Sequence, residues 1–270
     1  MDELLFESKM RSARSLPFLE GEAMVFSAME PGKETANEDA AALIRRDEGS
    51  GAIVVCDGAG GTPAGELAAR IVIEQIREQV AAAPDSDERL RTAVLNGVES
   101  ANSAILDRGQ GSATTFAAVT VSGSIIRPYH VGDSIILLTG QRGSVKLQTV
   151  SHSPVGFALE SGMLDETDAI HHEERHVVSN LVGTPEMRIE VGPPIEMARY
   201  DTLLLASDGL SDNLFVDEVI SIIRKGNIEE AAQVLAATAL ARMTQREEGR
   251  PSKPDDLTFV LYRRRPNPKR

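Results

Sequence analysis

The chain has 270 residues, 41% of them hydrophobic, which is enough for the core of one large domain. With 41 acidic and 28 basic residues its formal net charge is −13, and this argues against a nucleic-acid partner, because a surface that neutralises phosphates must be basic. A single cysteine, Cys56, excludes an internal disulfide and is compatible with a reducing, cytoplasmic location. No uncharged apolar run reaches membrane-spanning length, so we expect no membrane partner.

The first part of the chain predicts a short sheet that ends in a carboxylate. Residues 1–20 show no regular pattern and are expected to form a poorly specified lead-in, followed by a strand over 23–28. Strands over 40–44 and 53–56 are expected to pair as a hairpin. The second strand stops at Asp57 and turns on glycine, so it would deliver that carboxylate to an edge of the sheet. Taken alone, Asp-Gly after a strand is more often only a turn.

Two helices and then a run of short strands are expected next. Apolar residues recur every three or four positions over 68–80 and 90–105, which predicts two helices that lie on a sheet. Beyond them the pattern changes to that of strands, and the tight turns between these strands imply an antiparallel sheet. The strands expected here cover residues 114–121, 124–131, 135–139 and 144–149.

The last part of the chain is expected to hold a flap, two helices and a final strand. Residues 151–197 are irregular, and we interpret them as a helix and a mobile flap. Helices are expected over 216–224 and 228–243, and a strand over 257–262. A basic tail, 264–270, ends the chain.

The irregular region carries four of the five histidines, His152, His171, His172 and His176. A zinc site is conceivable there, but the spacing fits no standard ligand pattern. Histidines at the surface of a polar segment are therefore the favoured interpretation.

Acidic residues recur at the ends of the predicted strands. These positions are Glu38 or Asp39, Asp57, Asp133, Asp208 and Asp255. Because carboxylates that gather without basic partners repel one another, a divalent metal is the simplest explanation for them. Two hard cations can activate a water and clamp a phosphoryl oxygen, so the pattern favours metal-assisted phosphoester hydrolysis.

Six short motifs in a fixed order carry a resemblance to a known family. They are Asn37-Glu38-Asp39-Ala40, residues 55–61 around Asp57-Gly58, residues 111–115, residues 130–134 around Gly132-Asp133, residues 206–212 around Asp208-Gly209, and Asp255-Asp256-Leu257-Thr258. This set resembles the motifs of the PP2C-type (PPM) metal-dependent serine/threonine protein phosphatases. The resemblance implies an α+β fold, a four-layer α-β-β-α sandwich with two central antiparallel sheets. The phosphatase domain would span residues 21–263.

The resemblance also implies a metal centre with two divalent ions, Mg²⁺ or Mn²⁺, and a weaker third ion. The ligands that it implies are Asp57, which would bridge the two ions, together with Glu38, the Gly58 carbonyl, Asp208 and Asp255. Asp39 would hold a metal-bound water. Asp133, with Asp208, would recruit the third ion.

Three positions depart from the family pattern. Glu34 stands where many members have an arginine that binds the substrate phosphate, and Lys33 beside it could substitute or could be a solvated turn lysine. Ala59 replaces a histidine of many eukaryotic members, so a leaving group would take its proton from a water at the metals. Asp256 replaces a common asparagine and adds charge that could tighten metal binding.

The leading prediction is hydrolysis of phosphoserine and phosphothreonine in proteins, with Asp57, Asp39 and Lys33 as the catalytic residues. The partners would be a phosphorylated protein and an opposing serine/threonine kinase. The main alternative is a catalytically inactive PP2C-like module with a regulatory or binding role, for which the departure at Glu34 is the only support. A hydrolase of small phosphoesters also stays open.

Overall fold

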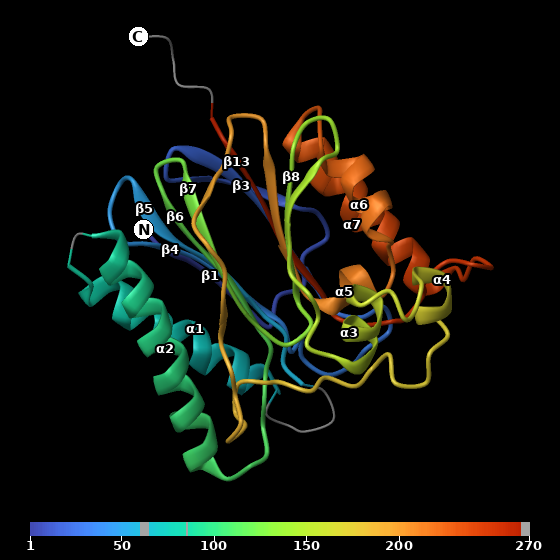
Figure 1. The fold of residues 1–270 in the computed structure, drawn as a ribbon, viewed down its shortest axis with the longest axis horizontal. Coiled ribbons are helices and arrows are strands. Elements are labelled where there is room, and N and C mark those ends of the chain that lie inside the picture. The colour runs from blue at the N-terminus through green and yellow to red at the C-terminus, as the bar shows by residue number, and fades with distance from the viewer. Residues whose placement is uncertain (60–64, 85, 266–270) are drawn as a thin grey trace.

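Two antiparallel sheets lie face to face at the centre of the fold, as described for residues 1–59, 65–84 and 86–265 in a computed structural model (Figure 1). One sheet has the order β1 (Glu3–Phe6), β4 (Ala40–Arg45), β5 (Ser50–Cys56), β6 (Phe116–Ser122), β7 (Ile125–Val131) and β10 (Glu190–Val191), and β11 (Ile195–Glu196) also pairs with β7. The other has the order β2 (Arg14–Phe18), β3 (Gly21–Ala28), β13 (Leu257–Arg264), β12 (Thr202–Ala206), β8 (Ile135–Thr139) and β9 (Val145–Gln148).

The central strands are apolar on both faces because each face packs against a different layer. In β5, Ile53 and Val55 belong to the core between the two sheets, whereas Val54 and Cys56 belong to the core under the helices. Successive side chains of a strand point to opposite faces, so a strand buried on both sides is an unbroken apolar run. The apolar runs in the sequence therefore mark the strands that are covered by a helix layer.

Helices cover the outer face of each sheet. α1 (Gly65–Ala82) and α2 (Asp87–Arg108) pack on the first sheet, and α6 (Val216–Ile223) and α7 (Ile228–Thr244) pack on the second (Figure 1). Shorter helices, namely α3 (Pro154–Glu160), α4 (Glu166–Ala169) and α5 (Asp208–Ser211), lie near one end of the sandwich (Figure 1). This arrangement confirms the predicted four-layer α-β-β-α sandwich. No helix of the described residues is both long and apolar enough to cross a membrane.

The interpretation of residues 1–20 as a poorly specified lead-in was wrong. β1 pairs with β4 and β2 pairs with β3, so each forms an edge strand of one sheet. Leu5 and Phe18 from these strands are buried in the core between the sheets. Edge strands are short and carry charged residues, which hides their periodicity in the sequence. The predicted domain limits of 21 and 263 stay a prediction, and most of the tail, 266–270, lies outside the described residues.

Candidate metal centre

Both sheets deliver acidic residues to one end of the sandwich. Ala40 pairs with Cys56, so Asp39 before β4 and Asp57 after β5 lie at the same end of the first sheet. In the second sheet Ala206 pairs with Phe259, so Asp208 and Asp256 likewise lie at one end. The Ser207 hydroxyl joins the two groups, because it donates to Asp39 Oδ2 at 2.7 Å.

Asp57 lies where these carboxylates meet. Burial raises its pKa well above the ordinary value, and the charges of Asp39, Asp208, Asp133 and Asp255 raise it further. The motif at 111–115 holds its main chain. Thr114 Oγ1 donates to the Asp57 carbonyl at 2.8 Å, and the Asp57 N–H donates to Thr115 Oγ1 at 3.0 Å. The strand end is thus fixed while the carboxylate faces like charges, which is the situation that a bound cation relieves.

Asp39 is more deeply buried, with 2% of its surface exposed. Its pKa is raised well above the ordinary value, first by burial, against the effect of the Ser207 hydrogen bond, and then by the charges of Asp256 and Asp208. Its Oδ1 is buried and has no hydrogen-bond partner among the described residues. An orphaned carboxylate oxygen at this position can accept a hydrogen bond from a water or bind a cation.

Asp133 follows β7 on a turn that only glycine can form. Gly132 has φ +104°, and a Cβ there would come within 2.8 Å of the Thr115 side chain. Burial and the charges of Asp208 and Asp212 raise the pKa of Asp133 to about 8. Burial and Asp208 likewise raise the pKa of Asp212 to about 6. Asp212, at the end of α5, is therefore a member of the cluster that the sequence did not single out.

Gly58, the predicted carbonyl ligand, is also fixed by its surroundings. A Cβ at this position would lie 2.4 Å from the main chain of Gly65 and 2.8 Å from the Glu38 carbonyl. The Gly58 N–H donates to that same carbonyl at 3.2 Å. Only a bare backbone fits there. A Cβ at Gly65 would lie 2.8 Å from Glu38 Oε1 and 3.2 Å from the Gly58 carbonyl oxygen, so these two oxygens flank the same glycine. The other glycines of the motif, Gly60 and Gly61, lie outside the described residues.

Lys33 forms ion pairs with two carboxylates of the same edge. Its ammonium lies 2.9 Å from Glu38 Oε2 and 2.7 Å from Asp256 Oδ2. Burial lowers its pKa, but hydrogen bonds to Asp256 and Glu38 outweigh burial and raise the pKa above the ordinary value. Lys33 is therefore charged and faces the cluster, and it is not a solvated turn lysine.

Asp256, which replaces the common asparagine, is held by three donors, and its charge helps to raise the pKa of Asp39. Its Oδ1 accepts a hydrogen bond from the Glu30 N–H at 2.9 Å, and its Oδ2 accepts one from the Glu38 N–H at 2.8 Å besides the Lys33 contact. That the added charge tightens metal binding stays a prediction. Its carboxylate organises the loop that carries Lys33 and Glu38.

The sequence also gave no hint of Lys253. Its ammonium contacts Oδ2 of three aspartates: Asp208 at 2.9 Å, Asp212 at 2.9 Å and Asp255 at 2.8 Å. Lys253 follows a polar loop without periodicity, and only its place two residues before Asp255 could have drawn attention to it. Asp255 and Asp208 are thus brought together, as predicted, with a lysine between them.

The donor set of this edge fits hard divalent cations. Its members are carboxylates from both sheets and a main-chain carbonyl, and such oxygen donors suit Mg²⁺ and Mn²⁺. Buried carboxylates with raised pKa values and the orphaned Oδ1 of Asp39 are the structural signs that positive charge belongs here. Cys56, in contrast, is fully buried in β5, and burial raises its pKa, so it cannot serve as a nucleophile.

A separate group on the first sheet consists of His130, His152 and Glu190, whose nitrogen and oxygen atoms lie within 4.8 Å of one another. Among the histidines considered for zinc, His152 alone belongs to this group in the part of the chain that the structure describes. His152 Nδ1 faces two donors, the Gly132 N–H at 3.1 Å and Asn180 Nδ2 at 2.9 Å. Its proton must then be on Nε2, which lies 3.1 Å from Glu190 Oε2. A protonated Nε2 cannot bind a metal, so this group is a hydrogen-bonded anchor in the observed arrangement.

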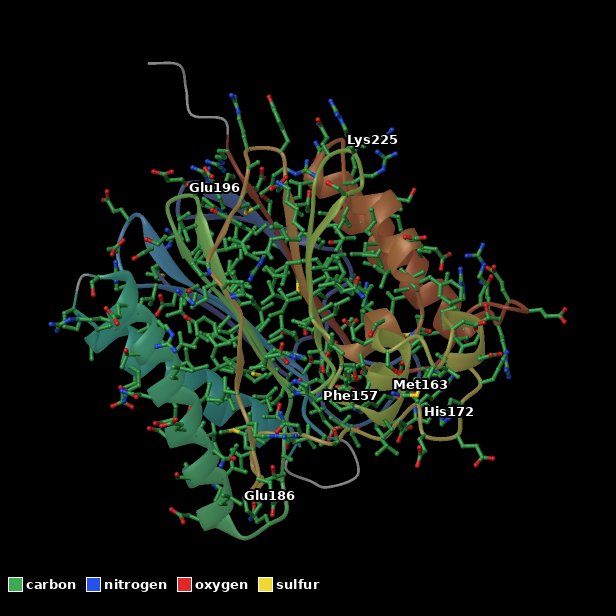
Figure 2. The ribbon with its side chains drawn as sticks, viewed as in Figure 1. Phe157, Met163, His172, Glu186, Glu196 and Lys225 are labelled. Carbon is green, nitrogen blue, oxygen red and sulfur yellow. The ribbon has the colours of Figure 1, made fainter. Side chains whose placement is uncertain are left out.

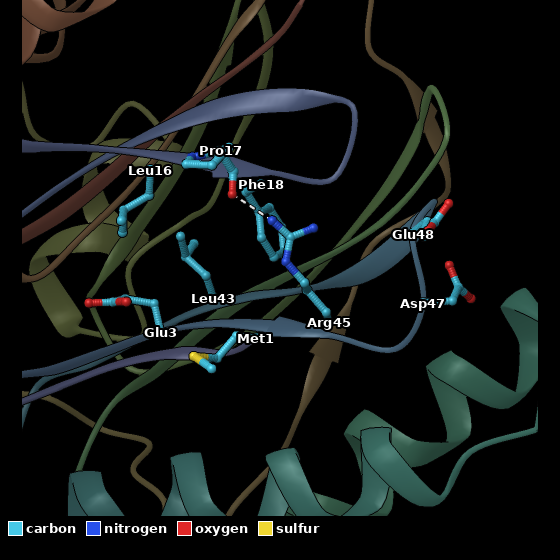
Figure 3. Close-up of a pocket in the computed structure, with 9 residues that line it drawn as sticks. All are labelled: Met1, Glu3, Leu16, Pro17, Phe18, Leu43, Arg45, Asp47 and Glu48. Carbon is cyan, nitrogen blue, oxygen red and sulfur yellow. Dashed lines mark hydrogen bonds between the residues drawn. The ribbon is translucent and has the colours of Figure 1, made fainter.

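A cavity of about 670 Å³ opens beside the carboxylates. Asp133, Asp208 and Asp212 line one side of it, and apolar residues of the irregular region line another, among them Val155, Leu159 and Leu164. A second pocket, of about 560 Å³, lies at the opposite end of β4, where Leu43 and Arg45 line it (Figure 3). That pocket holds none of the clustered aspartates, so the first cavity is the one that adjoins the candidate centre.

Known proteins match the chain over most of its length. The sequence model of a family described as protein phosphatase 2C matches residues 31–248. A putative protein phosphatase 2C-type of Streptococcus pyogenes is 28% identical over 222 residues, which cover 78% of this chain and 88% of that protein. The S. agalactiae serine/threonine phosphatase shares the fold, with a TM-score of 0.78 at 24% identity over 91% of this chain and 100% of that chain. The catalytic domain of the serine/threonine phosphatase PstP, solved with two manganese ions, aligns with a TM-score of 0.68 at 26% identity, over 89% of this chain and 96% of that chain.

Proposed function

The chain belongs to the protein phosphatase 2C family, and from that premise we propose that it hydrolyses phosphoserine and phosphothreonine in proteins at a centre of two divalent cations. The observation that carries this proposal is the convergence of Asp39 and Asp57 from one sheet with Asp208 and Asp255 from the other. Neither sheet alone could supply such a centre, because the ligands come from both.

The chain's own residues would bind the ions and orient the reactants. The residues proposed as ligands are Glu38, Asp57, the Gly58 carbonyl, Asp208 and Asp255. When bound, Mg²⁺ or Mn²⁺ lowers the pKa of a coordinated water and polarises the phosphoryl group. Asp39 would orient the attacking water through its Oδ1, while Ser207 holds the other carboxylate oxygen. No protein nucleophile is needed, in keeping with the buried position of Cys56.

Lys33 would bind the substrate phosphate in place of the usual arginine. An ammonium has three N–H donors, and Glu38 and Asp256 take two of them. The third donor is left for a phosphate oxygen. Because both carboxylates keep the ammonium charged and in place, the contact would be made without reorganising the loop.

A protein substrate is supported by the surface around the cavity. Its apolar side, which includes Leu159 and Leu164, adjoins the aspartates, so a residue next to the phosphorylated one could enter it. Phe157 and Met163 from the same region are 47% and 79% exposed, and both are labelled in Figure 2. A serine/threonine kinase would supply the substrate of this reaction, and the single buried thiol suits a reducing compartment such as the cytoplasm.

Nothing in the described residues favours the alternative of an inactive module. The carboxylates expected of a working centre are present, and their charges act on one another as a metal centre requires.

The proposal is tested by hydrolysis of an aryl phosphate and of a phosphothreonine peptide, each with Mn²⁺, Mg²⁺ or EDTA. We expect turnover with either metal, none with EDTA, and a loss of at least about 100-fold for Asp57→Asn, since one ligand charge would be removed. A folded wild-type protein that hydrolyses neither substrate with any metal would contradict the proposal. Turnover of the aryl phosphate alone would instead favour a small phosphoester as the substrate.

A further inference from the structure

Residues 152–179, which we call the cavity loop, form one wall of the cavity beside the carboxylates. The loop contains α3 and α4, and both helices contribute lining residues. Over 157–178, Ala169 is the one buried residue among those that the structure describes. The hydrogen bonds described for 157–178 all stay within residues 151–179. The loop therefore depends on its two ends for polar attachment to the sheets.

Both ends of the cavity loop meet at His152. The N–H and the hydroxyl of Ser179 both donate to the His152 carbonyl at 2.8 Å. Next in the chain, Asn180 Nδ2 donates to His152 Nδ1 at 2.9 Å, and the same amide is bonded to the N–H and the carbonyl of Arg188. His152 thus closes the loop with its main chain and with its side chain.

His152 also attaches the closed loop to the turn before Asp133. Its N–H donates to the Gly132 carbonyl at 2.9 Å, and the Gly132 N–H donates to His152 Nδ1 at 3.1 Å. Both main-chain polar groups of Gly132 are therefore bonded to one residue. The turn has a second support, because the Ser134 hydroxyl lies 2.6 Å from Thr115 Oγ1. Loss of the His152 side chain would thus release the loop more than the turn.

The His152 imidazole is fixed by its surroundings. It is buried, and its ring centroid lies 4.4 Å from that of His130 and 6.5 Å from that of Phe157 in α3. Its Nδ1 accepts from a donor on the turn and from a donor at the far end of the loop. A single acceptor atom therefore joins the turn and the two ends of the cavity loop.

We propose that His152 is a positioning residue for protein substrates, because its Nδ1 fixes the cavity wall against the turn that carries Asp133. A residue beside the phosphorylated one would then enter a preformed cavity, which lowers the cost of ordering on binding. This inference rests on the proposed function, since it presupposes a phosphoprotein substrate. A small aryl phosphate does not extend along the wall, so its hydrolysis should not depend on His152.

The first test compares KM and kcat for a phosphothreonine peptide and for an aryl phosphate, both with Mn²⁺. For His152→Ala we expect KM for the peptide to rise by about tenfold, because the acceptor of two hydrogen bonds is removed. The kcat for the peptide and both parameters for the aryl phosphate should stay close to those of the wild type. His152→Asn should restore KM for the peptide, since its Oδ1 can accept both hydrogen bonds. His172→Ala, at an exposed histidine of the same loop, is the matched control and should change neither substrate (Figure 2).

The second test does not depend on activity. Arg175 is the only lysine or arginine in 152–179, so cleavage by trypsin after Arg175 reports on how firmly the cavity loop is held. Limited digestion of the folded proteins, followed by mass spectrometry, should show this cleavage several-fold faster in His152→Ala than in the wild type. His152→Asn and His172→Ala should be cleaved there at the wild-type rate.

The outcomes separate this inference from the proposed function. An unchanged KM for the peptide, equal rises in KM for both substrates, unchanged cleavage after Arg175, or no rescue by His152→Asn would each overturn the role of His152 and leave the phosphatase proposal intact. A wild type that hydrolyses neither substrate refutes the proposed function and this inference with it. Should His152→Ala not fold, Asn180→Ala, which removes the donor at the far end of the loop, is measured with the same expected pattern.

Discussion

Asn213 offers the sharpest test of how this end of the sandwich is held together. Its side chain is fully buried and makes three hydrogen bonds, to the Lys253 N–H, the Lys253 carbonyl and the Gly209 carbonyl. Asn213→Ala would leave these main-chain groups without their partner. Each lost hydrogen bond costs about 1 kcal/mol, and more where the remaining group stays buried. The free energy of unfolding should therefore fall by roughly 3 kcal/mol.

For a chain of this size about 1 kcal/mol corresponds to a change in Tm of about 2–4 °C, so we expect the Tm of Asn213→Ala to fall by roughly 6–12 °C. The assay is thermal and urea unfolding followed by circular dichroism, in EDTA to exclude metal effects. Asn96→Ala is the matched control, because Asn96 is exposed on α2. A fall in Tm no larger than that of the control would refute the idea that Asn213 ties Lys253 to α5.

Other consequences can be measured separately. Lys33→Ala should raise KM for an aryl phosphate by about tenfold with a smaller effect on kcat, as expected for the loss of one charge-assisted hydrogen bond. An unchanged KM would contradict the proposal that Lys33 binds the substrate phosphate. Leu159→Ser should raise KM for a phosphopeptide several-fold and leave KM for the aryl phosphate unchanged, and equal effects on both would remove the cavity from substrate recognition. In EDTA, the free energy of unfolding should fall as pH rises from about 4 to about 8, because Asp133 and Asp212 bind protons more tightly when folded, with pKa values of about 8 and about 6. With Mn²⁺ the free energy of unfolding should depend less on pH over this range. A free energy of unfolding that rises from pH 4 to pH 8 in EDTA would contradict the predicted pH dependence.

The sequence predicted the fold well wherever a strand or helix had a strong apolar pattern. The helices expected over 216–224 and 228–243 are α6 and α7, and the strand expected over 257–262 is β13 with a two-residue extension. Such patterns are reliable because burial on one or both faces dictates the residue types. The edge strands β1 and β2 escaped detection, since a half-solvated strand of four or five residues has too few buried positions to show a period.

The acidic members of the candidate site were predictable, because each follows or precedes a strand with an unmistakable pattern. The basic members of the candidate site were harder to predict from the sequence. Lys33 contacts Asp256 across 223 positions of the chain, and Lys253 reaches Asp208 across 45. No local signal reports such contacts, because they depend on how two sheets stack and not on the sequence near either residue. Asp212 is different, because it lies four residues after Asp208 within the motif at 206–212, and that spacing could have identified it.

Two of the departures from the family pattern are joined by one ion pair. An aspartate in place of the common asparagine at 256 adds a negative charge, and Lys33 lies 2.7 Å from that carboxylate. The Asp256 carboxylate also receives the Glu30 and Glu38 N–H groups, so it sets the course of the loop on which Lys33 stands. Glu34, where an arginine was expected, is exposed and leaves the cluster to Lys33. The missing arginine therefore does not argue for a loss of activity, because a cation of the same charge stands one position earlier and is held there by the Asp256 carboxylate.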